Sequence, residues 1–69
     1  MRGYKYIGYI RNPLGKEKWS CYLRSEAVYM FTIDDEGKPV EKVKVFKSKN
    51  EIRNYITENG YKAFLTIFS

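Results

Sequence analysis

The sequence predicts a small α+β protein in which an antiparallel sheet of about 4–5 strands carries one helix on one face. Five short segments rich in Tyr, Ile, Val and Phe favour strands, and clusters of Asn, Asp, Pro and Gly separate them. A capping box at Ser48-Lys49-Asn50-Glu51 predicts the start of a single helix. The expected order is therefore β-β-β-β-α-β. A chain of 69 residues is too short for two hydrophobic cores, so residues 1–69 are expected to form a single domain.

The first two strands are predicted at Tyr4–Ile10 and Trp19–Arg24. Tyr4–Ile10 alternates in polarity and is rich in Tyr and Ile, as half-buried strands are. The segment Asn12-Pro13-Leu14-Gly15 has Pro at the second and Gly at the fourth position, which suits a type I turn. Alternation along Trp19–Arg24 puts its odd-numbered residues on one face and its even-numbered residues on the other.

The next two strands are predicted at Val28–Ile33 and Val40–Phe46. Val28–Ile33 is apolar on both faces, which indicates a central strand of the sheet. Residues 34–38, Asp-Asp-Glu-Gly-Lys, are expected to form a hairpin loop whose glycine is available for a positive φ. Charged residues and valines alternate in the second of these strands, so Lys42 and Lys44 are expected to share one face.

The helix and the last strand follow from the remaining pattern. Ile52, Tyr55 and Ile56 are spaced i, i+3 and i+4, a narrow apolar stripe that must pack on the sheet. Gly60 is expected to end the helix in a left-handed conformation. The final strand is predicted at Ala63–Phe68, beside either the first strand or the fourth. Beside the fourth, the pair would be parallel and the crossover right-handed.

The composition excludes several classes of site. The chain has no histidine and a single cysteine, Cys21, which excludes a disulfide within one chain, a Cys/His zinc site and histidine-based catalysis. Cys21 lies in the middle of a strand and is expected to be a core thiol. The cluster Asp34-Asp35-Glu36 is expected to be a solvated hairpin tip, because Val43 stands where a calcium-binding loop would need a Glu. We expect no enzymatic activity, no metal and no cofactor.

Hydropathy bears on the location of the protein. The longest unbroken apolar run is five residues, Ala27–Phe31. Such a run is too short for a membrane span or for the apolar part of a signal peptide. We therefore expect no membrane contact and a cytoplasmic location.

Charge and aromatic content point to a class of ligand. Residues 1–33 hold six basic and two acidic side chains, whereas residues 34–69 hold seven and six, and the net charge is +5. Basic residues bind phosphates and aromatic rings bind unstacked bases, so their mixture favours a nucleic-acid-binding sheet. Net charge also serves solubility, and strand lysines protect sheet edges. The residues predicted to neutralise phosphates or to pack on the ligand are Arg2, Lys5, Arg11, Lys16, Lys18, Arg24, Trp19 and Tyr22.

A longer pattern extends over Trp19–Glu58. It consists of a Trp that begins a strand, the turn Asp35-Glu36-Gly37-Lys38, a basic strand, and Phe46-Lys47-Ser48-Lys49 before the helix. This pattern resembles the arm-type DNA-binding domain of tyrosine integrases from phages and integrative transposons. The resemblance implies a three-stranded sheet laid in the major groove and backed by the helix, with DNA the expected ligand ahead of RNA. The base contacts that it implies come from Tyr22, Arg24, Lys42 and Lys44.

Two functions from different classes follow. The first is a small, basic, non-enzymatic nucleic-acid-binding protein, and a composition rich in Lys, Ile, Tyr and Asn suits a phage or mobile-element origin. The alternative is a small phage-type inhibitor or adaptor that binds a host or defence protein, either by strand addition or through an aromatic–arginine hot spot. Both are compatible with a monomer or an edge-strand homodimer. The hot-spot residues expected for the alternative are Tyr9, Tyr22, Arg24 and Tyr29.

Overall fold

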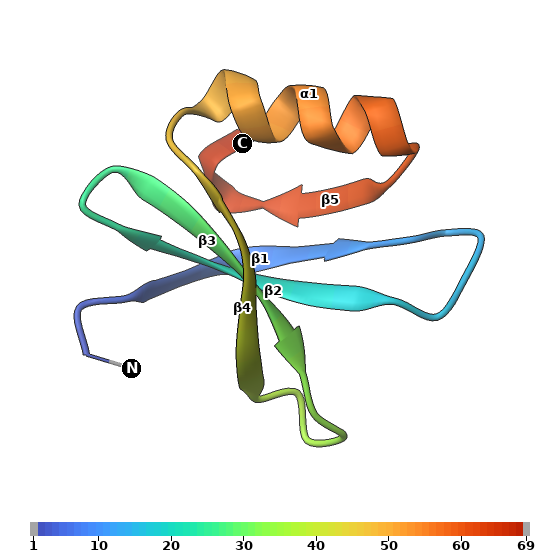
Figure 1. Cartoon of the computed structure of the whole chain (residues 1–69), viewed down its shortest axis with the longest axis horizontal. Helices are drawn as coiled ribbons and strands as arrows, with labels where there is room; N and C mark the ends of the chain where they lie inside the picture. Colours follow the sequence, from blue (N-terminus) through green and yellow to red (C-terminus); the bar gives the residue numbers. More distant parts are fainter. Residues whose placement is uncertain (1, 69) are drawn as a thin grey trace.

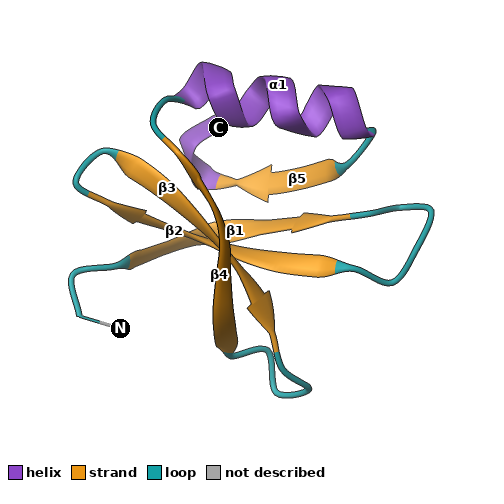
Figure 2. Ribbon diagram, viewed as in Figure 1, coloured by secondary structure: helices purple, strands orange, loops and turns teal. Residues whose placement is uncertain are grey.

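The computed structural model describes residues 2–68 and has the predicted α+β architecture, a single open sheet with one helix (Figures 1 and 2). The elements are β1 (Lys5–Arg11), β2 (Lys18–Arg24), β3 (Ala27–Ile33), β4 (Pro39–Phe46), α1 (Lys49–Asn59), β5 (Lys62–Leu65) and the 3-10 turn η1 (Thr66–Phe68). The strand order is β4-β3-β2-β1-β5, and all neighbouring strands are antiparallel. β3 is therefore an interior strand, between β2 and β4.

The position of β5 resolves the alternative that the sequence leaves open. β5 pairs with β1, and the pair is antiparallel. Figure 1 shows that α1 follows directly from β4 and runs above β5. The helix thus carries the chain from one edge of the sheet to the other, so no parallel pair is needed.

One face of the sheet packs against α1, and we call it the helix-side face. Cys21 lies at its centre, with 0% of its surface exposed, and burial raises the pKa of its thiol to about 12. The predicted core thiol is thereby confirmed, because a neutral buried thiol is neither a nucleophile nor a ligand. The buried apolar residues of this core are Ile7, Ile10, Cys21, Val28, Met30, Phe46, Ile52 and Leu65.

The predicted turns and caps are present. The hydroxyl of Ser48 accepts a hydrogen bond from the backbone N–H of Glu51 (3.2 Å), as an N-cap does. Gly60 ends the helix with φ 68°. The backbone N–H of Gly15 donates to the carbonyl of Asn12 (3.2 Å) and closes the β1–β2 turn. These elements depend on neighbouring residues alone, which is why the sequence predicts them.

The acidic cluster forms the predicted β3–β4 hairpin loop. A carboxylate oxygen of Asp34 accepts hydrogen bonds from the backbone N–H groups of Glu36 (2.9 Å) and Lys38 (2.8 Å). Gly37 has φ 83°. Across residues 2–68, no group of three or more acidic or thiol side chains is arranged to hold a metal ion. No helix in this part of the chain is long and apolar enough to cross a membrane.

The prediction that Lys42 and Lys44 share a face is wrong. Lys42 pairs with Phe31 and Lys44 with Met30, so β4 has one extra residue, Val43, between two pairs that are adjacent on β3. This bulge reverses the alternation. The ammonium of Lys44 lies 5.2 Å from the ring centroid of Tyr55 on α1, on the helix-side face, whereas Lys42 lies on the opposite face.

A second bulge breaks the predicted alternation of β1. Tyr6 pairs with Tyr22 and Gly8 with Cys21, so Ile7 is the extra residue. As a result Ile7 and Ile10, three positions apart, are both buried in the core, and Tyr6 and Tyr9 both face away from it.

The final strand is shorter than predicted. It ends at Leu65 and not at Phe68, because Leu65 pairs with Gly8, where the bulge in β1 interrupts the hydrogen-bonding ladder. The following residues form η1 instead, and Ile67 and Phe68 fold against the core.

Candidate functional site

The face turned away from α1, which we call the open face, carries its side chains in rows across the strands. Strand pairing aligns them, and rows two residues apart on a strand are about 7 Å apart. The first row is cationic over β5, β1 and β2 and apolar beyond them, and the other two are mainly aromatic. The rows are Lys62, Arg11 and Lys18, followed on β3 and β4 by Ile33 and Pro39; then Phe64, Tyr9, Ser20, Phe31 and Lys42; then Tyr6, Tyr22, Tyr29 and Val45.

Half of the open face, over β2 and β3, is filled by its own aromatic rings. The ring of Tyr4 stands nearly perpendicular to those of Tyr29, Phe31 and Tyr22, at centroid distances of 5.1, 6.0 and 6.4 Å. The guanidinium of Arg24 lies 5.0 Å from the Tyr4 ring. Edge-to-face packing of this kind stabilises the sheet and leaves these rings half-buried. We call these four rings the Tyr4 cluster.

The other half, over β1 and β5, presents rings to solvent. Tyr6 is 54% exposed and Phe64 is 52% exposed. The Tyr9 and Phe64 rings lie 4.9 Å apart and are inclined by 30°, and the ammonium of Lys18 lies 4.2 Å from the Tyr9 ring centroid. Partial burial and the neighbouring Tyr22 raise the pKa of Tyr6, so its phenol stays neutral. We call Tyr6, Tyr9 and Phe64 the aromatic platform.

A row of cations lies beside the aromatic platform, and we call Lys62, Arg11 and Lys18 the cationic row. A shallow groove of about 430 Å³ at the β1–β2 hairpin is lined by Arg11, Lys18 and Lys16 together with one ring of the platform. The carboxylate of Glu17 in this groove accepts a hydrogen bond from the side-chain amide of Asn12 (2.8 Å). Three cations thus line one groove and leave it positively charged.

The structure brings half of the sequence-predicted site residues onto one surface. Two more are exposed outside the strands: Arg2 in the N-terminal turn, and Lys16 in the β1–β2 loop, where it lines the groove beside the cationic row. The predicted residues on the open face itself are Arg11, Lys18, Tyr22, Arg24 and Lys42.

The remaining three predicted residues are on the helix-side face. Lys5 pairs with Leu23 and lies two residues before Ile7, so its side chain is on the same face of the sheet as that of Ile7. Trp19 packs against the core, with its ring 5.1 Å from that of Tyr61, and Lys44 lies there as well. Trp19 therefore cannot share a ligand with Tyr22. The sequence already indicated this position, because alternation along β2 places Trp19 on the same face as the core thiol of Cys21.

The predicted site residues did not include several residues of the open face, among them Lys62 and Phe64. Both lie on β5, and their side chains join the open face only because β5 pairs with β1 in the observed register. The signal in the sequence is the alternation of a charged and an aromatic residue with the buried Leu65. Which surface they join depends on the strand partner, which no local pattern specifies.

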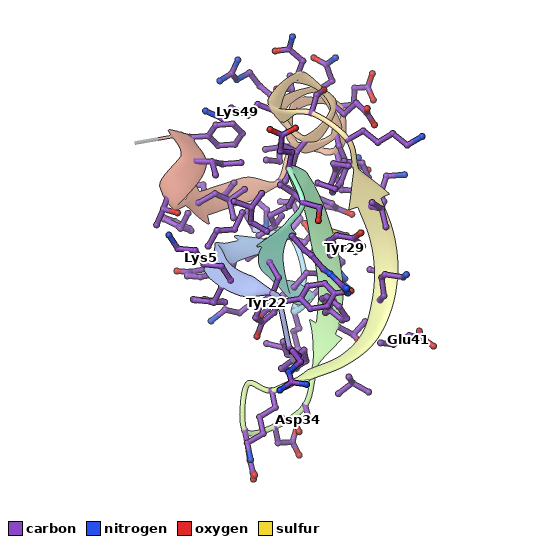
Figure 3. All side chains as sticks on the ribbon, turned by 90° about the vertical axis from the view of Figure 1, so that its left-hand side faces the viewer. Lys5, Tyr22, Tyr29, Asp34, Glu41 and Lys49 are labelled. Carbon is purple, nitrogen blue, oxygen red and sulfur yellow. The ribbon has the colours of Figure 1, made fainter. Side chains whose placement is uncertain are left out.

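Figure 3 shows two rings of the Tyr4 cluster, Tyr22 and Tyr29, together with Glu41 of β4. Tyr22 and Tyr29 lie close together on neighbouring strands, below the helix. Glu41, the one carboxylate within the described strands, points outward from β4 and away from both rings. The other acidic residues of residues 2–68 lie in turns and on α1.

Comparisons of the chain with protein-family models, with curated proteins and with solved structures find no match in any of the three. The resemblance to integrase arm-type domains is neither supported nor contradicted by them and stays a prediction. The interpretation of the site therefore depends on its own geometry and charge.

Proposed function

We propose that this protein binds nucleic acid through its open face and acts as a non-enzymatic, cytoplasmic binding protein. One observation carries the proposal: within residues 2–68, the strand positions of this face hold cations and no carboxylate. A face of one sign beside solvent-exposed rings is complementary to a polyanion that also has flat aromatic bases. The cations in question are Lys62, Arg11, Lys18, Arg24 and Lys42.

In the proposed mechanism the basic and the aromatic side chains bind different parts of the nucleic acid. Lys and Arg neutralise phosphates and release condensed counterions, which supplies most of the affinity and makes it fall with salt. The rings contact sugars and bases, which adds affinity that salt does not screen. The helix-side face is occupied by the core and α1, so it supports the sheet without taking part.

The test compares two double variants of equal charge. Arg11→Gln with Lys18→Gln removes two cations from the open face, and Lys49→Gln with Arg53→Gln removes the same two residue types from α1. Fluorescence anisotropy of a labelled DNA at about 50 mM salt measures affinity. We expect the open-face variant to bind about tenfold or more weakly and the α1 variant to bind nearly as the unmodified protein does.

Three outcomes would contradict the proposal. Equal losses in both double variants would mean that affinity follows net charge and not this face. Unchanged affinity in the open-face variant would assign the contacts elsewhere. Failure of the unmodified protein to bind DNA or RNA at low salt would reject nucleic acid as the ligand, and the protein-binding alternative would then be pursued with the hot-spot residues Tyr9, Tyr22, Arg24 and Tyr29.

A further inference from the structure

The division of the open face into a packed half and an exposed half indicates the form of the nucleic acid. We infer that the ligand is a single strand, whose unstacked bases lie on the aromatic platform while its phosphates follow the cationic row. This inference rests on the proposed function and specifies its substrate class. It departs from the major-groove binding that the integrase resemblance implies.

The exposed surface of the site suits base faces and not base edges. A duplex hides the flat faces of its bases and presents edges, which proteins contact with Asn, Gln, Arg and other polar side chains. Apart from its phenols, the neutral polar side chain in the described rows is that of Ser20, which is only 5% exposed. Of the two arginines, Arg24 covers the Tyr4 ring, and Arg11 lies in the cationic row, where it is placed for phosphates. The platform instead offers Tyr6 and Phe64, each more than half exposed. Such rings bind bases only where the bases are unstacked.

The spacing of the two parts fits one strand. The cationic row and the row that holds Tyr9 and Phe64 are two residues apart on β1 and β5, about 7 Å. A nucleotide bridges such a gap, with its phosphate on one row and its base on the other. Lys18 already covers the Tyr9 ring, so the stacking surface of this row is Phe64, and Lys18 is placed for an adjacent phosphate. Tyr6 lies in the next row, farther from the cationic row, and is placed for the base of a neighbouring nucleotide.

The Tyr4 cluster limits the site to this half of the face. Its rings contact one another at 5.1–6.4 Å and Arg24 covers Tyr4, so these half-buried rings offer a base less open surface than Tyr6 and Phe64 do. The bound segment is therefore expected to be only a few nucleotides, spanning β5, β1 and β2.

The experiment uses three labelled probes in fluorescence anisotropy. They are an oligothymidylate of about ten nucleotides, an abasic strand of equal length, and a mixed-sequence duplex of about twenty base pairs. The abasic strand keeps the phosphates and lacks the bases. We expect the oligothymidylate to bind about tenfold or more tightly than either of the others, because only it can stack.

Matched variants assign the contact to the platform. Phe64→Leu keeps an apolar side chain but removes the ring from the platform, and Phe68→Leu makes the same substitution where η1 packs on the core. We expect Phe64→Leu and Tyr6→Leu to weaken oligothymidylate binding between about fivefold and a hundredfold, with an unchanged salt slope. Phe68→Leu should leave it unchanged. Circular dichroism confirms that each variant is folded.

The outcomes separate this inference from the proposed function. Duplex binding as tight as single-strand binding, or abasic binding as tight as oligothymidylate binding, would overturn the inference and leave nucleic-acid binding standing. Equal affinities of the Phe64→Leu and Phe68→Leu variants would overturn the platform assignment. No binding of any probe would overturn both.

Discussion

Gly8 allows β5 to pack closely against β1, and it also allows the bulge that orients the rings of the aromatic platform. Its φ is 130°, a backbone conformation that L side chains rarely adopt. A Cβ atom at this position would lie 1.9 Å from the carbonyl oxygen of Phe64, far inside van der Waals contact. Gly8 also closes the bulge that turns Tyr6 and Tyr9 to the same face. No other residue type meets both requirements.

We expect Gly8→Ala to lower the free energy of unfolding by at least about 3 kcal/mol, because backbone strain and a backbone clash are combined. Gly37→Ala is the control, since Gly37 also has a positive φ (83°) but open space around its Cβ position. It should cost about 1–2 kcal/mol. Urea unfolding followed by circular dichroism measures both. Similar costs at the two positions would show that β5 does not approach β1 as closely as described.

The β2–β3 hairpin shows a local mismatch between sequence and backbone at the scale of an element. Its two-residue turn, Ser25 and Glu26, has φ values of 49° and 67°. Two successive positive φ values are typical of a type I′ turn, in which Asn-Gly is preferred. Neither Ser nor Glu favours this region, so the turn is maintained by the strands that it joins.

We expect Ser25→Asn combined with Glu26→Gly to raise the free energy of unfolding by about 1 kcal/mol, because the new residues accept the turn without strain. Glu36→Gly in the β3–β4 loop is the control, since the φ of Glu36 is not positive. There glycine only adds freedom to the unfolded chain and should be destabilising by about 0.5–1 kcal/mol. Thermal and urea unfolding measure both changes. A gain in both loops would contradict this account of the turn.

Elements defined by neighbouring residues could be predicted, and elements defined by distant ones could not. The cap at Ser48, the stop at Gly60 and the loop around Gly37 each follow from local backbone requirements, and each was predicted correctly. The bulges at Ile7 and Val43 depend on how adjacent strands align. A period-two pattern contains no mark of where an extra residue falls, so the face of Lys44 was predicted wrongly.

The candidate site shows the same limit. The charge surplus and the faces of β2 could be predicted from composition and alternation. Whether a ring belongs to the core or to a ligand surface depends on which face of the sheet α1 covers. Trp19 is on the covered face and therefore packs against the core. The contributions of Lys62 and Phe64 depend on the pairing of β5 with β1. Long-range pairing, and not residue type, defines the aromatic platform.

On the scale of the whole molecule, the distribution of charge matters more than its total. The net charge is +5, and the molecule extends 32 × 30 × 21 Å. At physiological salt the electrostatic field of an exposed charge is screened over about 8 Å. Cations on α1 therefore contribute little at the open face, and affinity should depend on the cations that touch phosphates there.

The number of cations that contact phosphates can be obtained from the salt dependence of the binding affinity. Each phosphate neutralised on a single strand contributes about −0.7 to the slope of log affinity against log salt concentration. The three residues of the cationic row predict a slope of about −2, and adding Arg24 and Lys42 predicts about −3.5. Arg11→Gln with Lys18→Gln should make the slope less negative by about 1.4, whereas Lys49→Gln with Arg53→Gln should leave it unchanged. Anisotropy titrations with oligothymidylate between about 50 and 200 mM salt give all three slopes. An equal change in both variants would mean that the protein binds through its overall field. A slope near −2 that only the open-face variant reduces would place the phosphates on the cationic row, beside the rings that are expected to hold the bases.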